Sequence, residues 1–161
     1  MDHPRNVGIG LDFSSNSKRG LTWATENLIR SGDHVFILIV QPKGSETGLP
    51  HLMSLWSETG SPLIPLFEFK EEKIQKDYGL TMDTADVIGV LDNLNLHHDV
   101  LINVKIYWGD PKEKLCEAVN KLELHSLVLG SRGQGTLKRA LLGSVSNYAV
   151  NHAMCPVTVV K

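Results

Sequence analysis

The chain has 161 residues, 42% hydrophobic and 21% charged, which favours one globular domain over residues 1–161. Its formal net charge of -2 gives no overall attraction to nucleic acid or to an anionic membrane, so neither is expected as a partner. No apolar stretch approaches the roughly 20 residues of a membrane span, and no secretory signal is recognisable. We therefore expect a cytoplasmic location, with the nucleus as a second compartment.

The first part of the chain predicts a strand, a helix and a second strand. Residues 6–11 (NVGIGL) are largely apolar and stop at Asp12 before a serine-rich stretch, as a strand followed by a helix start would. Apolar residues spaced by three and four then predict a helix that ends near residues 31–32. Residues 34–40 (HVFILIV) are apolar at nearly every position, which is typical of a strand covered on both faces.

A long loop without a sustained period is expected at residues 41–69. A loop of this length in a compact domain is usually functional or mobile, and its position at the end of a strand makes it a candidate lid. Its apolar content argues against a solvated linker, so we expect it to fold back onto the domain. These apolar residues are Leu52, Met53, Leu55, Trp56, Leu63, Ile64, Leu66 and Phe67.

The second part of the chain continues the alternation of helices and strands. Helices are expected at residues 71–96, 110–122 and 144–152, and strands at residues 102–108, 126–130 and 156–160. This alternation favours right-handed parallel crossovers, and hence an α/β fold with a doubly wound, five-stranded parallel sheet. Ligands of such sheets bind beyond the carboxyl ends of the strands, where Asp12, Val40 and Gly130 lie.

A glycine-rich motif, GSRGQGTLKRALLGSVS, follows the strand at residues 126–130. Its spacing is G-x2-G-x9-G-S, formed by Gly130, Gly133, Gly143 and Ser144. Glycines let a ligand approach the backbone, the helix that begins at Ser144 offers free amides to an anion, and Arg132 adds positive charge. The GK[ST] ending of a Walker A loop is missing. The motif predicts a phosphate-binding loop, and the alternative is a flexible strand-to-helix connection.

Other polar groups could also contact a nucleotide, and one of them, Asp12, has a second possible role. Ser131, Ser144 and Ser146 can supply hydroxyl donors to a phosphate. Asp12 can accept hydrogen bonds from a ribose hydroxyl or an adenine amine, or it can cap the turn at residues 14–17.

Together with GLDFS after the first strand, LIV in the second and HAMCPVTVVK at the end, the motif resembles the ATP-binding class of the universal stress protein family. The similarity is greatest to small single-domain plant members. It implies a Rossmann-like fold of the adenine nucleotide alpha hydrolase type with strand order 3-2-1-4-5. It also implies ATP or AMP as ligand, with Mg2+ or Mn2+ held through the phosphates and no protein metal ligand.

The resemblance also implies roles for particular residues. Asp12 would contact the ribose or adenine, and the backbone of Val40 would meet the adenine edge. The residues expected to line the ribose and phosphates are Gly130, Arg132 and Gly133, and those expected to cap the phosphates are Gly143, Ser144 and Val145. A homodimer through the last strand, residues 156–160, is implied as well, with higher oligomers beyond it.

Three functions are compatible with these features. The first is an adenine-nucleotide-binding module that regulates a signalling partner in the stress response. The alternative is an oligomerising, chaperone-like protective protein in which nucleotide is incidental. A slow ATPase ranks third, because no catalytic set of nucleophile, base and acid appears.

The two cysteines, Cys116 and Cys155, form neither a CxxC motif nor a zinc ligand set. We expect two reduced, partly buried thiols, and a redox-sensitive Cys155 is the alternative.

Overall fold

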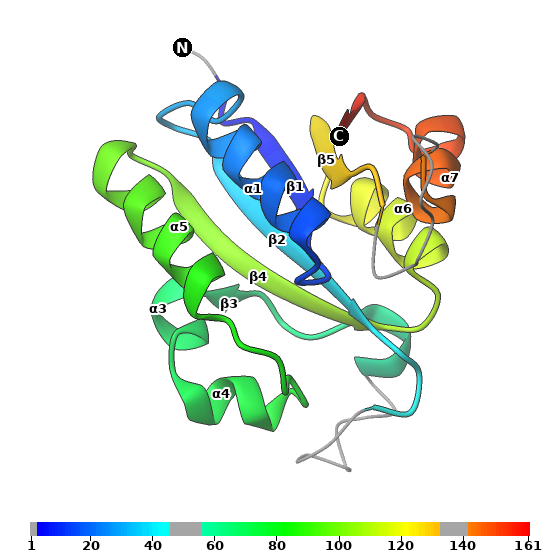
Figure 1. The fold of residues 1–161 in the computed structure, drawn as a ribbon, viewed down its shortest axis with the longest axis horizontal. Coiled ribbons are helices and arrows are strands. Elements are labelled where there is room, and N and C mark those ends of the chain that lie inside the picture. The colour runs from blue at the N-terminus through cyan, green and yellow to red at the C-terminus, as the bar shows by residue number, and fades with distance from the viewer. Residues whose placement is uncertain (1–2, 46–55, 133–141) are drawn as a thin grey trace.

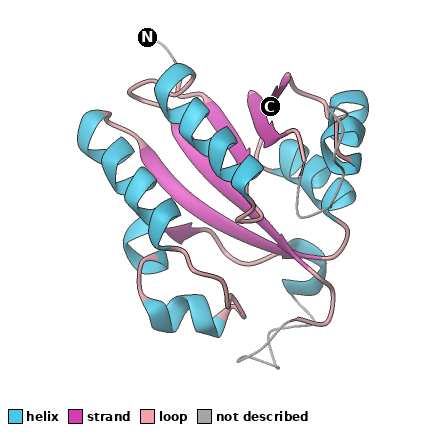
Figure 2. Ribbon diagram, in the orientation of Figure 1, coloured by secondary structure: helices cyan, strands magenta, loops and turns pink. Residues whose placement is uncertain are grey.

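The computed structural model describes residues 3–45, 56–132 and 142–161. Helices and strands alternate along most of the chain, with three successive helices between β3 and β4 (Figures 1 and 2). In chain order they are β1 (Asn6–Gly10), α1 (Ser15–Asn27), β2 (His34–Gln41), β3 (Ile64–Pro65), α3 (Leu66–Phe69), α4 (Glu72–Asp77), α5 (Ala85–His97), β4 (Leu101–Trp108), α6 (Pro111–Lys121), β5 (Ser126–Gly130), α7 (Ser144–His152) and β6 (Val157–Val160). None of the described helices is long and apolar enough to cross a membrane.

The sheet has six strands in the order β3-β4-β2-β1-β5-β6. The five strands β4, β2, β1, β5 and β6 pair in parallel in this order. They correspond to the predicted strands 3, 2, 1, 4 and 5, so the predicted order of these five is confirmed. The expected number of strands was wrong by one. The two-residue strand β3 pairs antiparallel with β4, with Ile64 opposite Val104. A strand this short carries no readable period, because only its pairing with β4 defines it.

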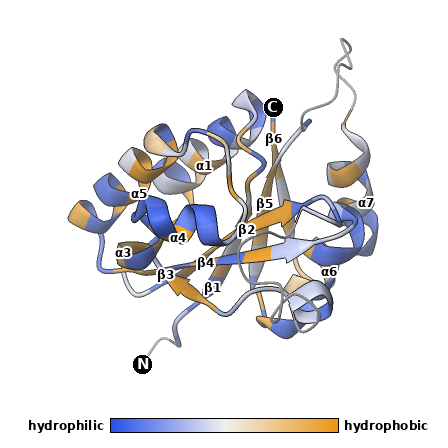
Figure 3. Ribbon diagram, turned by 90° about the horizontal axis from the view of Figure 1, so that it is seen from below, coloured by the Kyte–Doolittle hydropathy of each residue, from blue (hydrophilic) through white to orange (hydrophobic). Residues whose placement is uncertain are grey.

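Helices cover both faces of the sheet (Figure 1). Side chains of β2 alternate between the two cores: Val35, Ile37 and Ile39 belong to the core that includes buried residues of α1 and α5. Phe36 and Leu38 belong to the second core, which includes buried residues of α6 and α7. Each fully buried aliphatic side chain stabilises the fold by about 1.5–3 kcal/mol. In Figure 3 hydrophobic colour lies along much of the sheet, while the helices carry both hydrophobic and hydrophilic residues.

The single helix expected at residues 71–96 is two helices, α4 and α5, joined by residues 78–84. Gly79 adopts a φ of +77°, which a helix cannot contain, and thereby ends α4. The buried Gln75 then holds the connection: its Nε2 donates to Phe69 O at 2.9 Å, and its Oε1 accepts from Thr84 Oγ1 at 2.9 Å. The break is therefore built by local hydrogen bonds that hydrophobic spacing does not report.

The long segment after β2 folds back onto the domain in part. The Trp56 ring stacks on Trp108, with centroids 6.3 Å apart, and on Tyr78, with centroids 5.2 Å apart. Ile64 and Leu66 are also buried, which confirms the expectation for these residues. It was wrong for Leu63 and Phe67, which are 41% and 71% exposed. Leu52, Met53 and Leu55 lie outside the described residues.

His34, the first residue of β2, is held as a neutral ring. Its Nε2 lies 2.8 Å from Asn103 Nδ2, and its ring stacks on Phe36 with centroids 3.9 Å apart. With Asn103 Nδ2 as the donor, Nε2 accepts and carries no proton. Burial lowers the pKa of His34 below its ordinary value of 6.5.

This lowered pKa predicts a pH-dependent stability. Below pH 6.5 the unfolded chain protonates His34 before the folded chain does, so the free energy of unfolding falls until the folded pKa is passed. Above pH 6.5 the stabilising contribution of neutral His34 to the free energy of unfolding is fully present. Urea unfolding should show that the free energy of unfolding falls less between pH 7.5 and pH 5.5 in His34→Gln than in the parent.

The matched control is His3→Gln, because His3 is exposed and lies before the first strand. This variant should lose as much stability on acidification as the parent. An equal loss in His34→Gln and His3→Gln would contradict the assignment.

Candidate functional site

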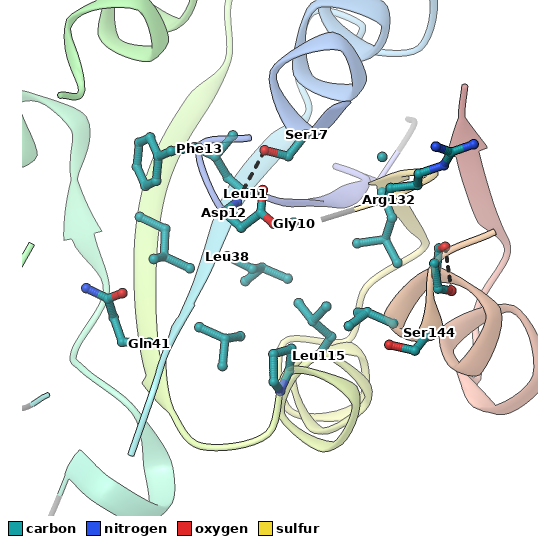
Figure 4. A pocket seen from close by; sticks show the side chains of 18 of the residues that line it. Gly10, Leu11, Asp12, Phe13, Ser17, Leu38, Gln41, Leu115, Arg132 and Ser144 are labelled. Atoms are coloured by element: carbon teal, nitrogen blue, oxygen red, sulfur yellow. Dashed lines mark hydrogen bonds between the residues drawn. The ribbon is translucent and has the colours of Figure 1, made fainter. Parts of the chain in front are cut away.

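A cavity of about 510 Å³ opens at the carboxyl ends of β1, β2 and β5 and at the start of α7 (Figure 4). β1 and β5 are neighbours in the sheet, but the helices that follow them, α1 and α7, pack on opposite faces. This is the switch point of a doubly wound sheet, where the diverging connections leave a crevice. The cavity therefore lies where the topology predicts a ligand site.

Seven of the eight predicted site residues line this one cavity. They are Asp12, Val40, Gly130, Arg132, Gly143, Ser144 and Val145. The eighth, Gly133, lies outside the described residues. The seven lie at the ends of β2 and β5, in the turns that follow β1 and β5, and at the start of α7, and the fold brings them together.

The turn after β1 holds Asp12 through hydrogen bonds to Ser14. Asp12 Oδ1 accepts from the Ser14 backbone nitrogen at 3.0 Å and from Ser14 Oγ at 2.5 Å. Ser14 is in turn the N-cap of α1, because its Oγ accepts from Ser17 N at 3.2 Å. Phe13 between them has a φ of +64°, which is uncommon for an aromatic residue. Asp12 thus takes part in the capping turn and lines the cavity as well.

Gly130, the first glycine of the motif, packs against the first turn of α1. A Cβ on Gly130 would lie 2.7 Å from both the carbonyl carbon and the oxygen of Asn16, and 2.9 Å from Ser17 N. These are backbone atoms that cannot move without displacing the helix. The absence of a side chain at Gly130 is therefore required by helix packing, whatever the cavity binds.

The start of α7 is tied to the end of β5. Gly143, the N-cap residue, donates its N–H to Ser131 O at 2.5 Å, and Ser146 Oγ donates to the same oxygen at 3.0 Å. Ser146 is 3% exposed, and its hydroxyl is used in bonds to Ser131 O and Gly143 O, whereas Ser131, 8% exposed, takes part through its backbone carbonyl. Ser144 is exposed, and the first amides of α7 point out of the helix with a partial positive charge.

Several cavity residues were missed by the sequence analysis. They are Gly10, Leu11, Phe13, Ser17, Leu38, Ile39, Gln41, Pro42, Met82, Gly109, Pro111, Leu115 and Leu129. Gly109 and Pro111 follow β4 at the same edge of the sheet, so the strand-end rule could have found them. Met82 lies between α4 and α5, and no motif marks it.

Metal and thiol chemistry have little support at this site. Within residues 3–45, 56–132 and 142–161, no group of three or more His, Cys, Asp or Glu residues could hold a metal ion. Cys116 and Cys155 are free and half-buried, as expected. Burial raises the pKa of both thiols, and Cys116 raises the pKa of Cys155 further. A raised pKa lowers the thiolate fraction, which argues against a redox-sensitive Cys155.

The fold and the cavity define a Rossmann-like α/β protein with a cavity at the switch point of its sheet. The model of the universal stress protein family matches residues 4–161, and the chain belongs to this family. This confirms the resemblance seen in the sequence motifs.

Plant relatives match almost the whole chain. Universal stress protein PHOS34 of Arabidopsis thaliana is 34% identical, and the match covers 98% of this chain and 62% of the relative. Universal stress protein PHOS32 of the same species is 33% identical, with 98% and 64% covered. The chain thus spans less than two thirds of the length of either relative.

Solved structures of the family share the fold. A universal stress protein family protein from Arabidopsis thaliana with AMP bound has a TM-score of 0.59 and 24% identity, covering 98% of this chain and 92% of that one. A universal stress protein in complex with cAMP has a TM-score of 0.62 and 21% identity, covering 99% of both chains.

The contact between Gly130 and α1 predicts a specific loss of stability. Gly130→Ala would place a methyl group against the α1 backbone, and this overpacking should lower the free energy of unfolding by about 1–3 kcal/mol. Chemical denaturation measures the difference. Gly89→Ala is the matched control, because nothing lies within 4 Å of a Cβ there and alanine favours a helix by about 1 kcal/mol. Equal stabilities for the two variants would contradict the packing role.

Proposed function

We propose that this chain binds an adenine nucleotide, ATP or AMP, and serves as a nucleotide-dependent regulatory module of the stress response. The observation that carries the proposal is the convergence of the seven described residues on one cavity. Its volume of about 510 Å³ suits a nucleotide-sized ligand, since small-molecule sites span about 300–1,000 Å³.

The chemistry of the cavity changes from one side to the other. Figure 4 shows Arg132 and Ser144 on one side and Gln41 on the other, with Asp12 between them. Positive charge and helix amides suit phosphates, and a carboxylate suits ribose hydroxyls. Leu38 adds an apolar wall for a base. This order matches the order of groups in a nucleotide.

Two further observations support an adenine nucleotide. Two proteins of the same fold are described with AMP and with cAMP bound. A divalent ion, Mg2+ or Mn2+, would be held by phosphate oxygens and water, because Mg2+ commonly uses substrate phosphates in place of a protein cage. Such an ion would offset the phosphate charge beside Arg132.

We further propose a homodimer through β6 and a cytoplasmic location. Among the described strands β6 pairs only with β5, so its outer edge can pair with a second copy. α1 links this edge to the cavity: its N-cap Ser14 holds Asp12, and Val160 of β6 packs on the core that includes α1. A nucleotide that binds one arrangement of α1 more tightly would therefore also favour one arrangement of the dimer edge.

Calorimetric titration tests the nucleotide site. Nucleotide-stripped parent should bind Mg-ATP with micromolar affinity, and Arg132→Gln should bind about 10- to 100-fold more weakly, because a charge-assisted hydrogen bond to phosphate is lost. Arg30→Gln removes the same charge from an exposed position beyond the C-terminal end of α1, whereas the cavity lies at the N-terminal end of α1. The affinity of this variant for Mg-ATP should therefore equal that of the parent.

Absence of binding by a stripped, folded parent would overturn the proposal. The oligomeric protective function would then be favoured, and it predicts that the protein suppresses client aggregation without nucleotide. Equal weakening by Arg132→Gln and Arg30→Gln would show that only overall charge matters.

A further inference from the structure

We infer that Gln41 reads the base in this cavity, selecting a purine with an amino group at C6 over one with an oxo group. This inference rests on the proposed nucleotide binding and goes on to name the part of the nucleotide that a particular side chain recognises. Gln41 is the last residue of β2 and lines the cavity.

The backbone of Gln41 is held by the neighbouring strand. Gln41 pairs with Trp108 in the register of β2 and β4, and its carbonyl accepts from Gly109 N at 2.9 Å. Side chains alternate along a strand, so Gln41 points to the same face as Ile39, which packs in the core of α1 and α5. Its carboxamide therefore reaches the cavity from a rigid support.

Gly79 determines which way the carboxamide faces. Gln41 Nε2 donates to Gly79 O at 3.4 Å, and a carbonyl oxygen can only accept. The nitrogen therefore faces Gly79, and Figure 4 shows the oxygen turned toward the cavity side chains. Rotating the amide by half a turn would place two oxygens against each other. Gln41 thus presents a hydrogen-bond acceptor to the cavity.

This acceptor lies where the base of a nucleotide would lie. Gln41 is on the wall opposite Arg132 and Ser144, with Asp12 between (Figure 4). Phosphates at Arg132 and a ribose at Asp12 place the base on the side of Gln41. The C6 amine of adenine donates hydrogen bonds, whereas the C6 oxygen of guanine or hypoxanthine accepts them. An oriented acceptor favours adenine and leaves a 6-oxo purine with an acceptor facing an acceptor.

A side-chain contact is distinguishable from a backbone contact. The family resemblance implies that Val40 meets the adenine edge through its backbone, and a substitution at position 41 leaves that backbone in place. Gln41→Met keeps the length of the side chain and removes the acceptor oxygen. Gln41→Glu keeps an acceptor oxygen for the cavity but loses the N–H that donates to Gly79 O, so it separates the acceptor from the hydrogen bond that orients it.

The experiment titrates nucleotide-free full chain with Mg-ATP and with Mg-ITP, which carries an oxo group at C6. The parent should prefer ATP by about tenfold or more, because a site built for a hydrogen bond rejects a ligand that cannot make it. In Gln41→Met the preference should shrink to about threefold or less, mainly through weaker ATP binding. Gln41→Glu should keep the preference for ATP, whatever its overall affinity.

A probe that needs no variant keeps the inference testable if a substitution impairs folding. N6,N6-dimethyl-ATP has no donor on the C6 nitrogen, so the parent should bind it about tenfold more weakly than ATP. Thermal denaturation of each variant checks its folding.

The outcomes separate the two claims. An unchanged ATP-to-ITP ratio in folded Gln41→Met, or equal binding of ATP and ITP by the parent, overturns the role of Gln41 and leaves nucleotide binding standing. Equal binding of ATP and the dimethyl analogue has the same meaning. A parent that binds no nucleotide overturns both the proposed function and this inference.

Discussion

The close approach of β5 to the first turn of α1 is the constraint on which the rest of the site depends. Gly130 reaches the carbonyl of Asn16 so closely that a single methyl group would not fit between them. A Cβ on Gly20 would lie 3.4 Å from Gly130 N, an ordinary van der Waals distance, so the close approach depends on Gly130 itself. As a result the end of β5 lies directly beside the turn that holds Asp12. A larger residue at 130 would push Arg132 and α7 away from that turn.

This contact changes how the glycine motif is understood. The motif predicts a loop that lets a phosphate approach the backbone, yet the structure explains Gly130 by helix packing alone. Gly143, by contrast, opens α7 and donates its N–H to Ser131, so it positions the amides that face the cavity. One spacing pattern thus records both a packing requirement and a binding geometry. The match to the family is informative because both must be met together.

Much of the fold was predictable from the sequence. Runs such as residues 34–40 are apolar on both faces, and the strands they predict are present with nearly the expected bounds. β3 was not predictable, because its two residues become a strand only by pairing with Val104. The break between α4 and α5 was missed because apolar spacing continues across it, while the left-handed Gly79 ends the helix.

The residues of the site also divide into those that the sequence predicts and those that it does not. Asp12, Arg132 and Ser144 belong to a recognisable motif or follow a strand end, and these signals can be read along the chain. Gln41 and Met82 reach the cavity through tertiary structure that no local pattern encodes. The motif therefore describes the side of the cavity with Arg132 and Ser144 better than the side with Gln41. Under the proposed function, differences in base preference within the family should arise from residues that the motif leaves unspecified.

α1 is the element that can carry the state of the cavity to the edge of the sheet. Its N-cap Ser14 bonds to Asp12, its first turn packs on Gly130, and Val160 of β6 packs on the core to which its buried residues belong. Because backbone atoms are in contact at Gly130, the helix and β5 must move together. A ligand that draws Asp12 toward itself acts on Ser14, and through α1 on the strand whose outer edge is open. If the proposed function holds, regulation needs no long pathway, because one helix contacts both the turn beside the cavity and the strand through which we propose a dimer.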